Sequence, residues 1–186
     1  MFIKNHLEAT RIIELLKPVR VMILKDLGRV IFSEVELSKG VEIELPRWIA
    51  ESLEKMGYAR IQRSFKSLED LNKIRYHEET RFEEKKIELY KISQDLYVES
   101  EKLVSDFRER AESRDPRAFQ ELERIIKVFQ RILRLRFRKI LYFIQVSESI
   151  DEDLERRMSI EEKIFYRYFL IGIYKWIREF EKFITG

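Results

Sequence analysis

The stretch "GVEIELPRWIAESLEKMGYARIQ", Gly40–Gln62, changes its periodicity halfway along. Apolar and acidic residues alternate over Val41–Leu45, as in a strand with one buried face. Pro46 keeps the residue before it extended, and its fixed φ suits the first residue of a helix. Helical spacing of apolar residues follows as far as Met56. This stretch therefore predicts a strand that passes directly into a short helix.

The helix start is expected to anchor a small hydrophobic core. Trp48 lies next to the apolar face of the predicted helix, and a module of about 60 residues buries too little surface to be stable without a large buried side chain. We therefore interpret Trp48 as a core anchor rather than as a platform for a ligand. The expected core anchors are Pro46, Trp48, Ile49 and Leu53.

Further strands are predicted on both sides of this unit. Val19–Asp26 and Arg29–Leu37 are rich in β-branched residues and flank a turn that contains glycine. Tyr58–Gln62 is a candidate last strand, and an amphipathic helix over His6–Leu16 precedes them. Residues 1–62 are thus expected to form a small α/β domain.

The rest of the chain is expected to be helical. From Ser67 to Arg110 the sequence contains no glycine or proline, which favours one long helix. Asp115 before Pro116 is a helix start signal, and Ser159 with Glu162 forms a candidate capping box for the final helix. The expected fold class is α+β: a small β-rich domain, a linker at 63–67, and a larger all-α helical bundle at 68–186.

Composition narrows the class of protein. The 186 residues include no cysteine, 5 glycines and 3 prolines, and 38% are charged. The absence of cysteine argues against a disulfide scaffold and a thiolate zinc site. No run approaches the roughly 18 apolar residues of a membrane span. We expect an intracellular, cytoplasmic protein, and the abundance of Lys, Glu and Arg hints at a thermophilic source.

Few residues could carry catalysis. The only histidines are His6 and His77, too few for a multi-histidine metal site. His77 stands beside two glutamates, but adjacent positions on a helix point in different directions. Glycine-rich phosphate loops and the Gly-x-Ser-x-Gly and His-Glu-x-x-His motifs are absent. The sequence predicts a non-catalytic protein without a metal or cofactor.

Positive charge is concentrated in one segment. Residues 124–147 carry seven basic and no acidic side chains. Helical spacing places five of them in one stripe, which could follow the phosphates of a nucleic acid. Acidic helices on either side could instead pair with the stripe, and this second interpretation is preferred. The stripe consists of Arg124, Lys127, Arg131, Arg134 and Arg138.

The last helix is unusually rich in aromatic residues. Between residues 164 and 183 they occupy more than one face, so a single neighbouring helix cannot cover them all. Large apolar surfaces usually mark contact sites. We expect an interface between subunits here, although a helix fully buried in its own bundle is the alternative. The candidate interface residues are Phe165, Tyr168, Phe169, Tyr174, Trp176 and Phe180.

The strand-to-helix stretch resembles the small β-rich domain of GINS complex subunits. In that family a glycine, an alternating strand and a Pro-x-Trp-x-Ala helix start lead to a leucine in the next turn. Pro46, Trp48, Ala50 and Leu53 match this pattern, whereas Arg47 stands where the family usually has an apolar residue. The segment "SLEDLNKIRYHEE" is similar to the start of the family's helical domain. The resemblance covers residues 40–79.

The resemblance implies an archaeal subunit with the small domain first, like the eukaryotic second and third "partner of Sld five" subunits. Such a protein is a non-enzymatic helicase accessory factor in the DNA replication machinery, or replisome, and is nucleoid-associated. It assembles with a sister subunit, whose helical domain comes first, into a 2:2 heterotetramer. The complex links the MCM helicase to a RecJ-like partner. Direct nucleic-acid binding through residues 124–139 remains the alternative function.

Overall fold

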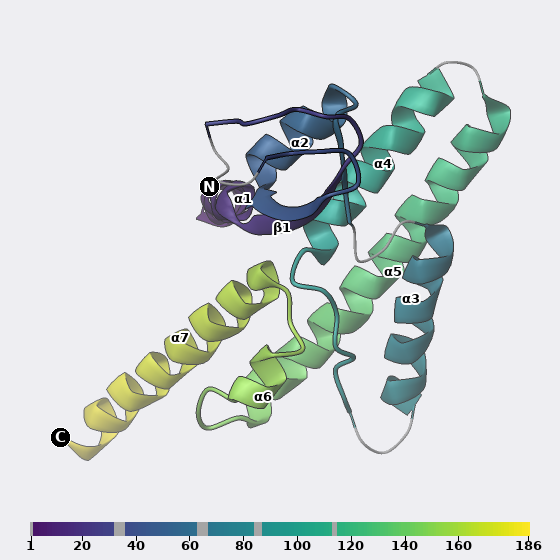
Figure 1. Ribbon diagram of the computed structural model, residues 1–186. Helices are drawn as coiled ribbons and strands as arrows, with labels where there is room; N and C mark the ends of the chain where they lie inside the picture. The colour runs from purple at the N-terminus through teal and green to yellow at the C-terminus, as the bar shows by residue number, and fades with distance from the viewer. Residues whose placement is uncertain (1, 32–35, 63–66, 84–86, 113–114) are drawn as a thin grey trace. The chain divides into compact units, whose positions relative to one another are not determined.

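The computed structural model describes residues 2–31, 36–62, 67–83, 87–112 and 115–186. Most of these residues are helical, and a small antiparallel sheet lies near the amino terminus (Figure 1). This composition is consistent with an α+β protein. The chain divides into two units, Met1–Ser64 and Phe65–Gly186. Of the predicted linker at 63–67, residues 63–66 lie outside the described residues.

The first unit contains a three-stranded antiparallel sheet in the order β2-β1-β3. The central strand pairs Val19 with Leu45 on one side and Val21 with Ile61 on the other. Gly28 and Leu37 form an isolated bridge, and residues 32–35 of the strand predicted there lie outside the described ranges. The elements are α1 (Phe2–Leu16), β1 (Pro18–Ile23), β2 (Glu42–Pro46), α2 (Arg47–Lys55) and β3 (Ala59–Ile61).

The strand passes directly into the helix, as the periodicity predicts, but the boundary lies one residue later than expected. Pro46 is the last residue of β2 and caps α2 with φ −50° and ψ 136°, so the helix begins at Arg47. The backbone N–H of Arg47 donates to the carbonyl of Lys17 at 2.8 Å. This bond satisfies one of the N–H groups in the first turn of a helix, which have no acceptor within the helix. Gly57, with φ +72°, follows the helix end.

The core of the first unit lies between the sheet and α2. β1 alternates exposed and buried residues, and Val21 and Ile23 are fully buried. Ile49 and Leu53 of α2 also belong to this core. Trp48, however, is 52% exposed, so the prediction that it anchors the core is wrong.

Trp48 is exposed because the buried stripe of α2 runs on the other side of Ile49. Besides Ile49 and Leu53, the stripe contains Ala50, which is fully buried. Successive residues of a helix are turned by about 100°, so Ala50 extends the stripe on the side of Ile49 away from Trp48. The small side chain, and not the indole, faces the core. Pro46, the remaining predicted anchor, is partly buried.

The second unit is built from helices. The long helix predicted from Ser67 is wrong, because residues 87–93 lack helical structure and separate two helices. Tertiary contacts compete with helix formation there: Leu89 is fully buried, and the N–H of Ile92 donates to the carbonyl of Arg157 at 3.4 Å. The helices are α3 (Leu68–Glu83), α4 (Leu96–Glu112), α5 (Pro116–Val146), α6 (Glu152–Glu155) and α7 (Ile160–Thr185).

Two predicted helix starts are confirmed. The Asp115 side chain accepts a hydrogen bond from the N–H of Arg117, with Pro116 as the first helical residue of α5. Ser159 and Glu162 form the capping box of α7. Among the described residues, no helix combines the length and apolar character that crossing a membrane requires.

Candidate interaction surfaces and a buried ion cluster

The first half of α7 packs against α5. Tyr166 and Leu170 are buried in one cluster with Ile140 and Ile144 of α5. The hydroxyl of half-buried Tyr174 donates to the carbonyl of Ser147 at 3.0 Å. These residues repeat every four positions and form the face of α7 that is covered by its own unit.

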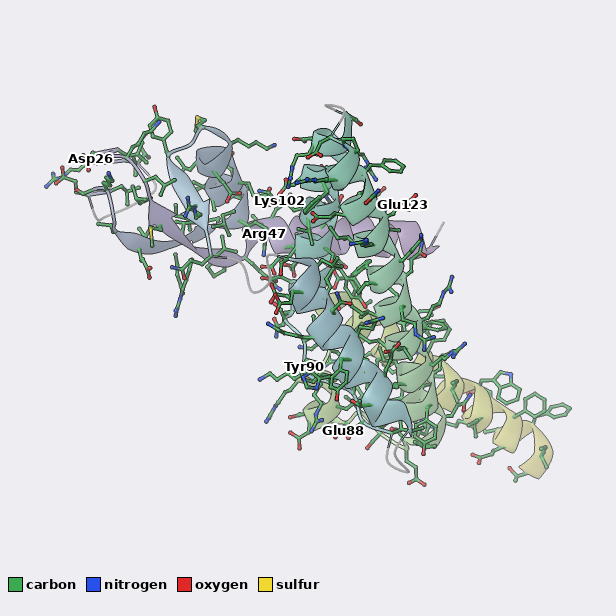
Figure 2. The ribbon with its side chains drawn as sticks, turned by 90° about the vertical axis from the view of Figure 1, so that its right-hand side faces the viewer. Asp26, Arg47, Glu88, Tyr90, Lys102 and Glu123 are labelled. Atoms are coloured by element: carbon green, nitrogen blue, oxygen red, sulfur yellow. The ribbon has the colours of Figure 1, made fainter. Side chains whose placement is uncertain are left out.

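The second half of α7 leaves this packing. Figure 1 shows its carboxyl-terminal part extending away from α5 and α6, and every residue from Lys175 to Gly186 is exposed. Figure 2 shows ring side chains that project from this part of α7, where no other described helix of the second unit lies next to it. Trp176 is 63% exposed and Phe183 is 84% exposed. Such exposure of large apolar side chains is unusual for a protein surface.

Some of the exposed apolar residues of α7 follow a regular spacing. Five of them are separated by 4, 3, 4 and 3 positions, so they share one face of α7, which we call the α7 seam. Gly172 lies at its edge, and an open hollow there is lined by Tyr168, Phe169 and Trp176, among others. The α7 seam consists of Phe169, Ile173, Trp176, Phe180 and Phe183.

The candidate interface residues divide between these two faces. Phe169, Trp176 and Phe180 belong to the α7 seam, and Tyr168 beside it is 52% exposed. Phe165 is partly buried, with its ring 4.5 Å from that of Phe169. Tyr174, in contrast, faces the interior of the unit. Burial raises the pKa of its hydroxyl, and Glu148 adds to this effect.

The five residues of the predicted basic stripe all lie on the exposed side of α5. The predicted pairing with a flanking acidic helix is found for one of them: Arg131 Nε lies 2.9 Å from Glu79 Oε1 of α3. Lys127 pairs instead with Glu123 of its own helix at 3.5 Å. Within the described ranges, no carboxylate forms an ion pair with the other three, Arg124, Arg134 and Arg138.

The opposite side of α5 carries two buried basic residues. Arg136 Nε and Nη2 donate to Glu162 Oε1 and Oε2 at 2.6 Å and 2.8 Å. Nη1 contacts Glu78 of α3. Lys139 Nζ donates to the other oxygen of Glu78 at 2.6 Å and to its backbone carbonyl at 2.8 Å. Two positive and two negative charges therefore meet inside the unit, and their side chains are fully or almost fully buried.

Backbone groups complete this buried ion cluster. The guanidinium of Arg136 also donates to the carbonyl of Tyr90 at 2.8 Å and to that of Arg157 at 3.0 Å. The N–H of Tyr90 donates to Glu78 at 3.1 Å, and the Arg157 side chain contacts Glu88. Figure 2 labels Glu88 and Tyr90 on the segment that follows α3. The cluster thus holds a non-helical segment against α3 and α5.

Electrostatics keeps Arg136 charged. Burial alone would lower the pKa of Arg136, but the carboxylates of Glu162 and Glu78 outweigh it and raise this pKa above the usual value of arginine. Burial, together with the charge of Glu162, also raises the pKa of the Tyr97 hydroxyl, which donates to Glu162 Oε1 at 2.7 Å. These groups bind one another rather than expose a reactive atom, so the arrangement supports a structural role.

Sequence reasoning missed this cluster. The basic segment includes Arg136 and Lys139, but the spacing of the stripe does not, because these two residues lie on the buried side of α5. Glu162 was recognised only as a capping residue. A helical projection of α5 could have revealed two basic residues among the apolar ones, a pattern that requires buried acidic partners.

His77 and the potential metal ligands are the remaining candidates for a reactive site in the described parts of the chain. The His77 ring stacks on the Tyr90 ring, with centroids 4.4 Å apart and 14° between their planes. No group of three or more potential metal ligands occurs among the residues that the structure describes. The exposed surfaces of α5 and α7 are therefore the features to which a function can be attached.

Comparison with known proteins found no match in two searches. No family model matches the sequence, and no curated protein is significantly similar to it.

Proposed function

We propose that this chain is a non-catalytic scaffold subunit of a GINS-type replication complex. The observation that carries the proposal is the α7 seam, a row of exposed aromatic and aliphatic side chains on a helix whose carboxyl-terminal part extends away from α5 and α6 (Figure 1). A scaffold subunit needs such a surface, because it acts by holding other proteins together.

The spacing of the α7 seam fits a partner helix. Alternating steps of three and four residues are the repeat with which two helices interlock their side chains. Phe169 and Phe183, the first and last residues of the seam, are 14 positions apart, which corresponds to about 21 Å of helix at 1.5 Å per residue. The hollow beside Gly172 offers a place for one side chain of the partner.

The identity of the partner comes from the resemblance. The Pro46, Trp48, Ala50 and Leu53 pattern and the position of the small β-rich domain before the helices support a GINS subunit of the small-domain-first type. The finer fold assignment is part of this proposal: residues 1–62 form the small GINS domain, and 68–186 form the helical one. The partner on the α7 seam is then the sister subunit, in a 2:2 tetramer that links MCM to a RecJ-like protein.

Exposed Trp48 changes how the motif is interpreted. Because the indole is 52% exposed, it is available to a partner and does not fill the core of the first unit. Under the proposal, the motif combines an architectural part, Ile49 and Leu53, with Trp48 as a contact residue for the other replication proteins. Tryptophan is enriched at the centres of protein interfaces.

The proposal is tested by measuring mass after co-expression. The chain is expressed alone and together with the sister GINS subunit of the same source, and each product is analysed by native mass spectrometry. A 2:2 complex is expected from co-expression, and self-association is expected from the chain alone, since the α7 seam is then uncovered. A stable monomer that does not bind the sister subunit would contradict the proposal.

A further inference from the structure

The exposed side of α5 combines arginines with aromatic rings. Phe137 is 49% exposed and Tyr142 is 41% exposed, beside the exposed Arg134 and Arg138. Arg134, Arg138 and Tyr142 are four positions apart and form one row, and Phe137 lies three positions after Arg134. We call these four residues the Arg134 surface. It lies on α5 and borders the start of the α7 seam, because Phe137 contacts Phe165, which in turn contacts Phe169. Its two arginines distinguish it from the seam, whose five residues carry no charge.

The Arg134 surface carries two exposed positive charges. Residues 124–147 contain no aspartate or glutamate, so this part of α5 supplies no opposite charge, and the glutamates of α5 lie in its first turns, at 121 and 123. Arg131, the next residue of the stripe, is held by Glu79 of α3. In the parts of the chain that the structure describes, no carboxylate pairs with Arg134 or Arg138. Two guanidinium groups are thus available to an external anion.

The same surface is held in a fixed shape. Arg136 and Lys139 tie the opposite side of α5 to Glu78 and Glu162. The Phe137 ring lies 5.3 Å from that of Phe165 on α7, and the Tyr142 ring lies 5.6 Å from that of Phe143. A ligand therefore meets a helix face and a Phe137 ring that are already positioned, which lowers the ordering cost of binding.

We propose that the Arg134 surface binds single-stranded nucleic acid. The arginines would contact successive backbone phosphates, and Phe137 and Tyr142 would stack on bases. Arg134 and Arg138 are separated by about 6 Å along the helix axis. An acidic protein segment would use the two charges but not the exposed rings beside them, and a base-paired duplex would hide its base faces from the rings. Unpaired bases use both parts of the surface.

The test is a titration at several salt concentrations. Fluorescein-labelled dT20 is titrated with the full chain, or with the complex in which it purifies, and binding is followed by fluorescence anisotropy between about 50 and 200 mM salt. The double variant Arg134→Ala/Arg138→Ala should flatten the slope of log K against log salt by about 1.4, because each single-strand phosphate contact contributes about 0.7. Near 0.1 M salt, binding should weaken about 25-fold.

Three control variants separate the contributions. Lys73→Ala/Lys182→Ala also removes two exposed charges, but both lysines already face carboxylates, so the slope should not change. Arg131→Ala should have a smaller effect than either arginine of the surface, since Glu79 pairs with Arg131. Tyr142→Ala removes a ring without a charge and should weaken binding about tenfold at an unchanged slope.

Four results would overturn the proposal. The first is no detectable binding of dT20 at 50 mM salt, and the second is a salt slope that the double arginine variant leaves unchanged. The third is duplex DNA that binds as tightly as dT20, together with a Tyr142→Ala variant that binds as wild type does. The fourth is poly-glutamate that competes as well as unlabelled dT20 at equal charge. The first two would remove the nucleic-acid contact, the third would remove base stacking, and the last would assign the surface to an acidic protein. None of them bears on the mass measurement that tests the scaffold function.

Discussion

Arg136 and Glu162 form a buried bidentate ion pair that joins the middle of α5 to the first turn of α7. Both carboxylate oxygens of Glu162 accept from the guanidinium, at 2.6 Å and 2.8 Å. The same carboxylate accepts from the N–H of Ser159 at 3.1 Å in the capping box. One side chain thus determines where α7 begins and how it is held against α5. The direction in which the α7 seam is presented depends on this pair.

Removing Arg136 should strongly destabilise the second unit. Arg136→Met would leave the buried carboxylate of Glu162 without its cation and Glu78 with Lys139 alone, and losing one partner of a buried pair costs about 3–5 kcal/mol. The free energy of unfolding is measured by urea denaturation followed by circular dichroism. Arg134→Met is the matched control, because it changes an exposed arginine of the same helix and should stay within about 0.5 kcal/mol of wild type. Equal effects of the two variants would show that the buried cluster does not stabilise the unit.

The buried hydroxyl of Tyr97 should make stability fall at alkaline pH. Burial and the charge of Glu162 raise its pKa in the folded protein, whereas in the unfolded chain tyrosine titrates near 10. Above about pH 10 the unfolded chain therefore loses the proton that the folded protein retains, and unfolding becomes more favourable. The contribution is present below the unfolded pKa and disappears as pH rises through the folded one.

Tyr97→Phe should reduce this alkaline loss. The difference in unfolding free energy between wild type and variant is measured at pH 9 and pH 11. It should shrink as pH rises, because the variant lacks the titrating hydroxyl. Tyr142→Phe, which changes an exposed hydroxyl, serves as the control. A difference that stays constant from pH 9 to pH 11 would show that Tyr97 is not responsible.

The first unit should depend on Leu53 far more than on Trp48. Leu53→Ala removes a buried side chain from the core and should cost about 2–5 kcal/mol. Trp48→Ala should cost only about 1 kcal/mol, because about half of the indole is already exposed. Native-state hydrogen exchange of the β1 amides measures the stability of the first unit in both variants of the intact chain. A larger loss of protection in the Trp48 variant than in the Leu53 variant would restore the core-anchor interpretation.

A charge in the α7 seam should prevent assembly without unfolding the chain. Phe180 is 51% exposed in the isolated chain, so Phe180→Asp should leave its helical circular dichroism unchanged. In a helix–helix interface, losing a central aromatic residue costs at least about 2 kcal/mol, or about 30-fold in affinity. Mass photometry of the co-expressed protein measures the shift from complex to free chain.

The control for this prediction lies on the same helix. Arg178 is exposed on the side of α7 opposite the seam, and Arg178→Ala should leave the mass of the complex unchanged. If Phe180→Asp assembles as wild type does, another surface must hold the partner.

The sequence determined the features that depend on neighbouring residues. Asp115, Pro116, Ser159 and Glu162 predicted two helix starts correctly, because a cap is made within one turn of the helix. The change of periodicity at Pro46 likewise predicted the passage from strand to helix. Spacing alone also predicted that one side of the helix carries Arg124, Lys127, Arg131, Arg134 and Arg138, and all five are exposed.

Only the tertiary structure decided which side chains meet. Glu78 and Arg136 are 58 positions apart, so no local pattern relates them, yet burial makes each a necessary partner of the other. Residues 87–93 read as helix, but the carbonyl of Tyr90 and the side chain of Leu89 are held by α5 and its neighbours, which outweighs helix propensity. Trp48 lies beside the correct stripe, but the core of the first unit takes up Ala50 and leaves the indole exposed. Spacing sets the direction of a side chain on its own helix, whereas the neighbour that it meets is set by packing across the whole unit.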